Sequence, residues 1–164
     1  MVLVVSGLLL SACSDEANTL DQAATERAVG RAVAAEVEPS VTSTRCAGSL
    51  EADRGATFRC DVVVKGAGTL EVEARQVNDE GSLVVTPSAA VVARERVASE
   101  LKATLNEQFG RSFQVSCTGP PHEVRAPKST STCTARDRTS RRTITVTVTD
   151  SAGTLSFAVG PEAD

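Results

Sequence analysis

Four cysteines constrain the fold of this chain most, because they form two pairs of nearly equal spacing. The stretch from Cys46 to Cys60 is almost as long as the stretch from Cys117 to Cys133. Four cysteines allow three disulfide pairings, and the similar spacing favours Cys46–Cys60 with Cys117–Cys133. Local loops of this kind indicate two similar units in an oxidising compartment.

The sequence around the two pairs also repeats. "ERAVGRAVAAEV" ends at Val37, and "ASELKATLNEQF" ends at Phe109. Further along each copy, "TLEVEARQV" corresponds to "RTITVTVTD", and "GSLVVTP" corresponds to "GTLSFAV". A repeat of this length predicts two copies of one small unit. We expect a first domain over residues 20–87 and a second over residues 88–164, joined near "TPSAA".

Each copy begins with a helical pattern. Val29, Val33 and Val37 share one helix face in the first copy, and Leu101, Leu105 and Phe109 share one in the second. We expect Thr19 and Gln22 to form a capping box, Ser88 to cap the second helix and Gly110 to end it.

Alternating strands follow each helix. "LEVEA" directs Leu70, Val72 and Ala74 inward, and "TITVTVT" directs Ile144, Val146 and Val148 inward. The polar residues between them predict antiparallel sheets with one face in water. The predicted fold class is α+β: two tandem small domains, each an amphipathic helix packed on a three- to four-stranded antiparallel sheet with one disulfide.

The composition makes covalent support valuable. Apolar residues make up 41% of the chain, but aromatic residues only 2%, with four Phe and neither Tyr nor Trp. Small cores with so few rings bury little area and often depend on disulfides. A closed loop of about 15 residues stabilises by roughly 3 kcal/mol in the entropic model.

The amino-terminal segment ends in "LLLSAC". Its apolar run, Val2–Leu10, is too short for a membrane-spanning helix of about 20 residues and fits a secretory signal. Leu10-Ser11-Ala12-Cys13 resembles the bacterial lipobox, whose cysteine receives a diacylglycerol. We therefore expect residues 1–12 to be a signal peptide and 13–19 to be the lipidated Cys13 with its tether. The protein would then be lipid-anchored at the extracytoplasmic face of the cell membrane. The alternative is a buried cysteine in an ordinary first strand.

Candidate catalytic and metal-binding residues are few. His122, the only histidine, lies between prolines in "GPPHEVRAP", without a G-x-S-x-G or H-E-x-x-H motif. We expect it in a solvated loop. The cysteines lack the C-x-x-C spacing of structural zinc sites. The sequence therefore predicts no enzyme, no metal and no cofactor.

Charge differs between the two halves. Residues 14–87 carry 7 basic and 13 acidic side chains, whereas residues 88–164 carry 10 basic and 8 acidic ones. One interpretation is a basic patch for anionic headgroups, cell-wall polymers or an acidic protein face. The other, which we favour, is a solvated hairpin. Stacking aromatics are missing, so no nucleic-acid partner is expected. The basic residues concerned are Arg125, Lys128, Arg136, Arg138, Arg141 and Arg142.

The lipobox, capped helix, "GATFRC" and Val-rich strand before "GSLVV" together resemble the family called domain of unknown function 4333. The first copy matches better than the second, which has "STSTC" before its second cysteine. This resemblance implies an envelope lipoprotein or secreted protein of high-GC Gram-positive bacteria, and no activity. We expect a non-enzymatic module that binds or positions an envelope protein or an anionic polymer. The tandem outline is also similar to bacterial β-lactamase inhibitor proteins, and that likeness implies the alternative of a secreted or surface inhibitor of an extracellular enzyme.

Overall fold

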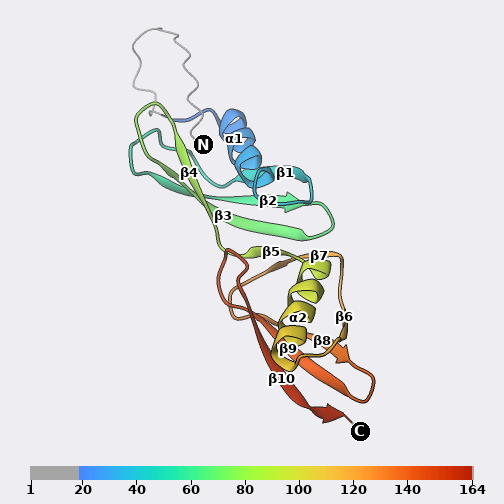
Figure 1. The fold of residues 1–164 in the computed structure, drawn as a ribbon. Helices are drawn as coiled ribbons and strands as arrows, with labels where there is room; N and C mark the ends of the chain where they lie inside the picture. The colour runs from blue at the N-terminus through green and yellow to red at the C-terminus, as the bar shows by residue number, and fades with distance from the viewer. Residues whose placement is uncertain (1–18, 164) are drawn as a thin grey trace, which may run out of the picture.

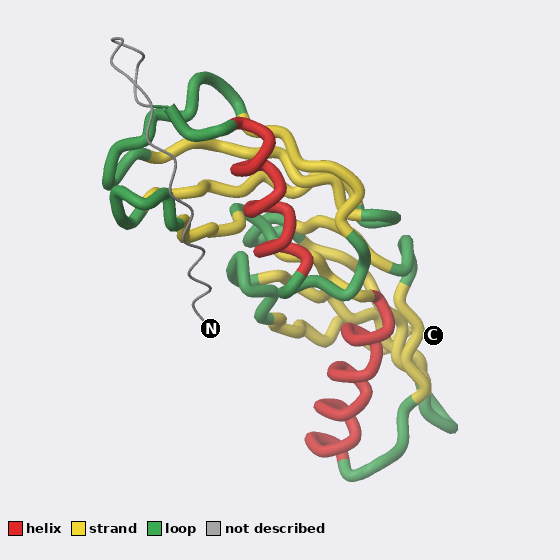
Figure 2. The backbone as a smooth tube through the Cα atoms, turned by 90° about the horizontal axis from the view of Figure 1, so that it is seen from above, coloured by secondary structure: helices red, strands yellow, loops and turns green. Residues whose placement is uncertain are grey.

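Two helices, each followed by an antiparallel sheet, make up residues 19–163, which are the residues that the computed structural model describes. The two halves follow one another along a long axis (Figure 1). Seen from above, each helix lies against its own group of strands (Figure 2). The predicted signal peptide and Cys13 lie outside the described residues. Neither of the described helices is long and apolar enough to cross a membrane.

The first half is a helix and a four-stranded meander. Its elements are α1 (Gln22–Ala34), β1 (Val41–Cys46), β2 (Thr57–Val64), β3 (Gly68–Gln76) and β4 (Leu83–Pro87), with strand order β1-β2-β3-β4. Burial alternates along β2 and β3, as their apolar and polar residues do. Leu70, Val72 and Ala74 are buried as predicted.

The second half has the same order of elements with one insertion. Its elements are α2 (Arg94–Phe109), β6 (Gln114–Cys117), β8 (Thr130–Arg136), β9 (Arg141–Val148) and β10 (Leu155–Ala163), in the order β10-β9-β8-β6. Ile144, Val146 and Val148 are buried as predicted. The prediction of helices with antiparallel sheets is therefore confirmed, with four strands in each large sheet.

A separate two-stranded sheet lies between the halves. β5 (Ala90–Ala93) pairs with β7 (His122–Arg125), and β7 belongs to the segment inserted between β6 and β8. Val124 N donates to Ala67 O at 3.0 Å, which ties the insertion to the β2–β3 turn of the first half. His122 is thus paired with Ala93 in a strand, and its expected placement in a loop was wrong.

Each half has its own core. α1 supplies Val29 and Val33 to the first core, and α2 supplies Leu101 and Leu105 to the second. Phe109, expected on this stripe, is instead 39% exposed because it stands at the last turn of α2, and Phe113 after the helix is buried in its place.

The helix ends differ from the predicted ones. Asp21, not Thr19, caps α1, since its carboxylate accepts from Ala24 N at 2.6 Å. β5 runs directly into α2, so its N-cap is Ala93, which makes no side-chain cap. Ser88 lies before β5 and donates to Glu71 O. Gly110 ends α2 in the left-handed conformation, with φ of 63°, as predicted.

Both favoured disulfides are present, Cys46–Cys60 and Cys117–Cys133. In each pair the two cysteines stand directly opposite one another on neighbouring antiparallel strands. Ala47 N donates to Arg59 O, so Cys46 and Cys60 form a non-hydrogen-bonded pair, in which the side chains come closest.

Candidate functional site

Reactive side chains do not converge in the described part of the chain. The four cysteines of residues 19–163 are in disulfides, and no group of His, Cys, Asp and Glu there could hold a metal ion. His122 Nε2 lies 3.7 Å from Glu38 Oε2, which is largely exposed. This pair joins β7 to the segment after α1.

The first disulfide is held at the edge of its sheet by two side chains of α1. Glu26 Oε1 accepts from Cys46 N at 3.0 Å, and Gln22 Nε2 donates both to Cys46 O and to Glu26 Oε1. The hydrogen bond from the Cys46 backbone, followed by that from Gln22, lowers the pKa of Glu26. α1 therefore satisfies the backbone groups of Cys46 that point away from β2.

The six basic residues singled out from the sequence fall into two groups. Arg125 is 13% exposed and is engaged by Glu123, Ser129 and Thr130 O, while Lys128 follows it in the turn before β8. The other four, at the opposite end of β8 and β9, occupy the hairpin between these strands: Arg136, Arg138, Arg141 and Arg142. The structure brings these four together and leaves Arg125 and Lys128 apart.

Asp137 fixes the turn of this hairpin. Its Oδ1 accepts from Thr139 N at 2.9 Å and from Ser140 N at 2.7 Å. These backbone hydrogen bonds, with smaller help from Arg111, lower the pKa of Asp137 to about 2. Arg111 Nη1 lies 2.9 Å from Asp137 Oδ2, and its guanidinium stacks near the Phe109 and Phe113 rings. Arg136 and Arg141 stand directly opposite on the outer face, a like-charge pair that costs stability.

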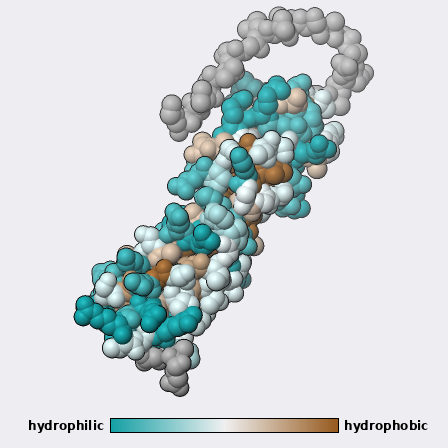
Figure 3. Space-filling model, turned by 90° about the vertical axis from the view of Figure 1, so that its right-hand side faces the viewer, coloured by the Kyte–Doolittle hydropathy of each residue, from teal (hydrophilic) through white to brown (hydrophobic). Residues whose placement is uncertain are grey.

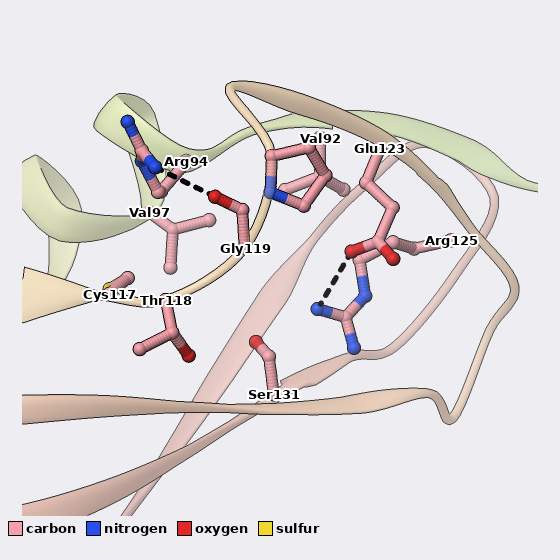
Figure 4. Close-up of a pocket in the computed structure, with 10 residues that line it drawn as sticks. Val92, Arg94, Val97, Cys117, Thr118, Gly119, Glu123, Arg125 and Ser131 are labelled. Carbon is pink, nitrogen blue, oxygen red and sulfur yellow. Dashed lines mark hydrogen bonds and ion pairs between the residues drawn. The ribbon is translucent and has the colours of Figure 1, made fainter. Parts of the chain in front are cut away.

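A small pocket lies between β5, β7 and the end of β6 (Figure 4). Arg94 Nη1 donates to Gly119 O at 2.7 Å at one side, and Arg125 Nη1 lies 3.6 Å from Glu123 Oε2 at the other. Its volume is about 30 Å³, which admits a water molecule but not a metabolite. We therefore do not assign a ligand to it.

A larger cavity, which we call the α1–β4 cleft, opens between the two halves. Its volume is about 480 Å³, within the size range of small-molecule and side-chain pockets. Apolar side chains of α1, β3, β4 and the linker to β5 line most of it, and Figure 3 shows apolar surface in brown on the first half, among hydrophilic atoms. The apolar lining comprises Ala32, Val33, Val37, Leu70, Leu83, Val85, Pro87, Ala89, Ala90, Val91 and Ala152.

The position of α1 explains why the cleft exists. A Cβ on Gly30 would lie 2.7 Å from Thr44 Oγ1, so the helix and β1 are in close contact at this glycine. One helix, about 10 Å wide, cannot fully cover four strands spaced by about 4.8 Å. The inner faces of Leu83 and Val85 therefore stay partly exposed. Polar groups enter only at the rim, from Glu36, Arg96 and Ser151.

Sequence reasoning missed the α1–β4 cleft because its residues read as ordinary core. "GSLVVTP" has the pattern of a half-buried strand, and the sequence does not say which strand the helix leaves uncovered. One signal was available: at the offset that separates Val37 from Phe109, the counterpart of Val85 is Phe157. Phe157 packs against the second core, so the first half has a smaller side chain where the second has a ring.

A family comparison supports the resemblance drawn from the first half. Residues 3–81 match the model of a family described as "Domain of unknown function (DUF4333)". The matched segment is thus similar to that family, and the match ends just before β4. Neither the curated proteins nor the solved structures contain a significant match to the chain.

Proposed function

We propose that this chain is a lipid-anchored protein of the extracytoplasmic membrane face and binds or positions another envelope component through the α1–β4 cleft. The cleft is the observation that carries the proposal. An apolar cavity of about 480 Å³ is costly to leave open to water, and a cavity with few polar groups at its rim suits binding.

The surroundings of the cleft favour binding over catalysis. Glu36 and Arg96 are its ionisable lining residues, and Arg96 Nε is already paired with Glu100 at 2.7 Å. A general acid or base needs a positioned partner and a tuned pKa. Glu36 is exposed, and no second catalytic group is positioned beside it in the cleft lining.

The sequence before residue 19 supports the anchor. Leu10-Ser11-Ala12-Cys13 has the order of a lipobox, and the family match begins at residue 3, so it includes this segment. Two acyl chains on Cys13 would suffice for stable membrane attachment, because each buried methylene contributes about 0.8 kcal/mol.

We further propose that the second half is a diverged copy of the first. Thr25, Val29 and Val33 of α1 are buried, as are their counterparts in α2 at the offset between Val37 and Phe109, which are Val97, Leu101 and Leu105. The register agrees as well, since Ala74 pairs with Val85 as Val146 pairs with Phe157. This shared offset supports common descent better than the low residue identity does.

One experiment tests anchor and cleft together. The full chain and its Cys13→Ser variant are expressed in a high-GC Gram-positive host and separated into membrane and soluble fractions. The wild type should sediment with membranes and the variant should not. If wild type and variant are distributed equally between the two fractions, the lipid anchor is refuted. If both proteins are found only in the soluble fraction, the alternative of a secreted inhibitor is favoured.

The cleft arm uses the soluble Cys13→Ser chain and the neutral apolar dye Nile red. We expect saturable binding that is lost in a Val85→Phe variant, because the ring that the second half carries at this position would fill the cleft. Val63→Phe is the control: Val63 is also exposed apolar surface, but it lies on the outer face of β2. Equal dye binding by both variants would refute the cleft as a binding site.

A further inference from the structure

β4 is an edge strand whose free backbone groups can be identified from its register. Val77 N donates to Ser82 O, and Ser88 N donates to Glu71 O. Since bonded and non-bonded pairs alternate in an antiparallel ladder, Val84 and Thr86 bond to β3, whereas Leu83 and Val85 do not. The N–H and C=O groups of Leu83 and Val85 therefore point away from β3, and no described residue bonds to them.

The opposite edge of the same sheet is partly occupied by α1. Gln22 and Glu26 of α1 occupy the outward N–H and C=O of Cys46, and α1 approaches β1 closely at Gly30. Proteins commonly protect edge strands in such ways, because exposed ladders recruit other strands.

The edge strands of the second sheet differ from β4. β6 packs beside α2, and β10 is irregular after Val159 and contains Pro161. β4 has only its short length and the terminal Pro87 to limit pairing. Its exposed side chains are Val84, which is 45% accessible, and Thr86, and neither carries the charge that often protects an edge strand.

The open edge coincides with the α1–β4 cleft. Leu83 and Val85 direct their side chains into the cleft and their backbone groups outward from the sheet. A strand added antiparallel to β4 would place every second side chain on the face that the cleft occupies. Hydrogen bonds along the strand and apolar seats for alternate side chains are the two components of recognition by strand addition.

Charge around this edge is mainly acidic. The exposed acidic groups on the strands, turn and helix beside it are Glu36, Glu71, Glu73, Asp79 and Glu80. Arg31, Arg75 and Arg96 oppose them, and Arg96 is paired with Glu100. A strand that enters this field is favoured when basic residues flank its apolar positions.

We propose that β4 binds an extended peptide segment of a partner protein by antiparallel strand addition, with apolar residues at alternate positions and basic residues beside them. The inference rests on the proposed function in that it takes the α1–β4 cleft as the binding site. It adds the chemical class of the ligand: a polypeptide strand, recognised through its backbone.

The test uses the soluble Cys13→Ser chain and the peptide acetyl-Lys-Val-Thr-Leu-Thr-Val-Lys-amide, measured by calorimetry at low salt. In an antiparallel pair, the peptide residues opposite Leu83 and Val85 place their side chains on the same face as these two residues and exchange backbone hydrogen bonds with them. N-methylation of the peptide's Val and Leu residues should therefore weaken binding by about tenfold or more, whereas N-methylation of its Thr residues should leave binding within about twofold. Equal affinities of the two methylated peptides, or no binding of the unmodified peptide, would overturn the proposal.

A variant of the protein gives the reciprocal test. Val85→Pro removes the outward N–H but keeps an apolar side chain in the cleft, and edge strands tolerate proline where the N–H faces away from the ladder. Peptide binding should be lost while Nile red binding persists. If the Cys13→Ser chain binds Nile red but binds all methylated peptides equally well, strand addition is refuted and the cleft remains a binding site. If this chain shows no saturable Nile red binding, the cleft itself is refuted. The methylated peptides keep the test decisive if Val85→Pro does not fold.

Discussion

The two disulfides allow a sharp test of how this chain is stabilised. We consider replacing Cys46 and Cys60 by alanine in one variant, and Cys117 and Cys133 in another, both in the Cys13→Ser background. The separations are 14 and 16 residues. The entropic model gives about 3 kcal/mol for each loop, and a difference between them of only about 0.1 kcal/mol.

Urea unfolding followed by circular dichroism measures both effects. Since domains are stable by only about 5–15 kcal/mol, a loss of about 3 kcal/mol should lower the unfolding midpoint visibly in each variant. The two variants should be equally destabilised. If their free energies of unfolding differed by more than about 1 kcal/mol, closure of the loop would not be the main source of the stabilisation. Packing of the buried Cys46, Cys60 and Cys133 sulfurs would then be the better explanation.

Three further results are expected. Leu101→Ala should destabilise the chain by about 2–5 kcal/mol because Leu101 is fully buried, whereas Phe109→Ala, at an exposed position, should cost far less in the same urea assay; similar costs would contradict the assigned core. The pKa of Asp137 is lowered to about 2, so its contribution to stability is present above its unfolded pKa and is lost as the pH falls from about 4 to 2. The Asp137→Asn variant should therefore show a flatter acid-unfolding curve in this pH range. An unchanged curve would contradict the stabilising role of the Asp137 hydrogen bonds in the turn. The last prediction concerns the four arginines of the β8–β9 hairpin, Arg136, Arg138, Arg141 and Arg142. Replacing all four by serine should abolish the salt-sensitive binding of the chain to anionic vesicles. If the wild-type chain does not bind such vesicles at low salt, the hairpin is only a solvated turn.

Local patterns predicted much of this fold because each depends on neighbours in sequence. The alternation of Leu70, Val72 and Ala74 identifies the buried face of a strand without knowledge of its partner. Gly110 ends a helix through its own backbone freedom. The disulfides could be predicted from the cysteine spacing because the paired strands lie close in sequence. Cys46–Cys60 joins the consecutive strands β1 and β2, and Cys117–Cys133 joins β6 and β8, which are separated only by the short insertion with β7.

The missed features depend on distant pairing. β5 and β7 are four residues each and are separated by all of α2 and β6, so neither has a local signal beyond a few apolar residues. The N-cap of α1 is Asp21 and not Thr19, so the predicted start of the helix was two residues early, a shift that is common for helix ends. The α1–β4 cleft is the hardest case, because Leu83 and Val85 have the same pattern whether a helix covers them or not.

The proposals together restrict where a partner would be found. The described fold begins at Thr19, and Leu20 lies beside Gly81, 3.3 Å from where a Cβ on that glycine would be, in the turn before β4. Six residues, 13–18, can span at most about 20 Å. A chain anchored at Cys13 would therefore hold the start of β4 close to the membrane surface, while the distal arginines stand at the far end of the molecule (Figure 1). The acidic first half is repelled by anionic headgroups over about one Debye length, roughly 8 Å, so it would stand off the surface and leave the β4 edge open. A basic-flanked strand emerging from a membrane protein meets these conditions better than a segment held in the distant wall, because the short tether keeps β4 near the bilayer.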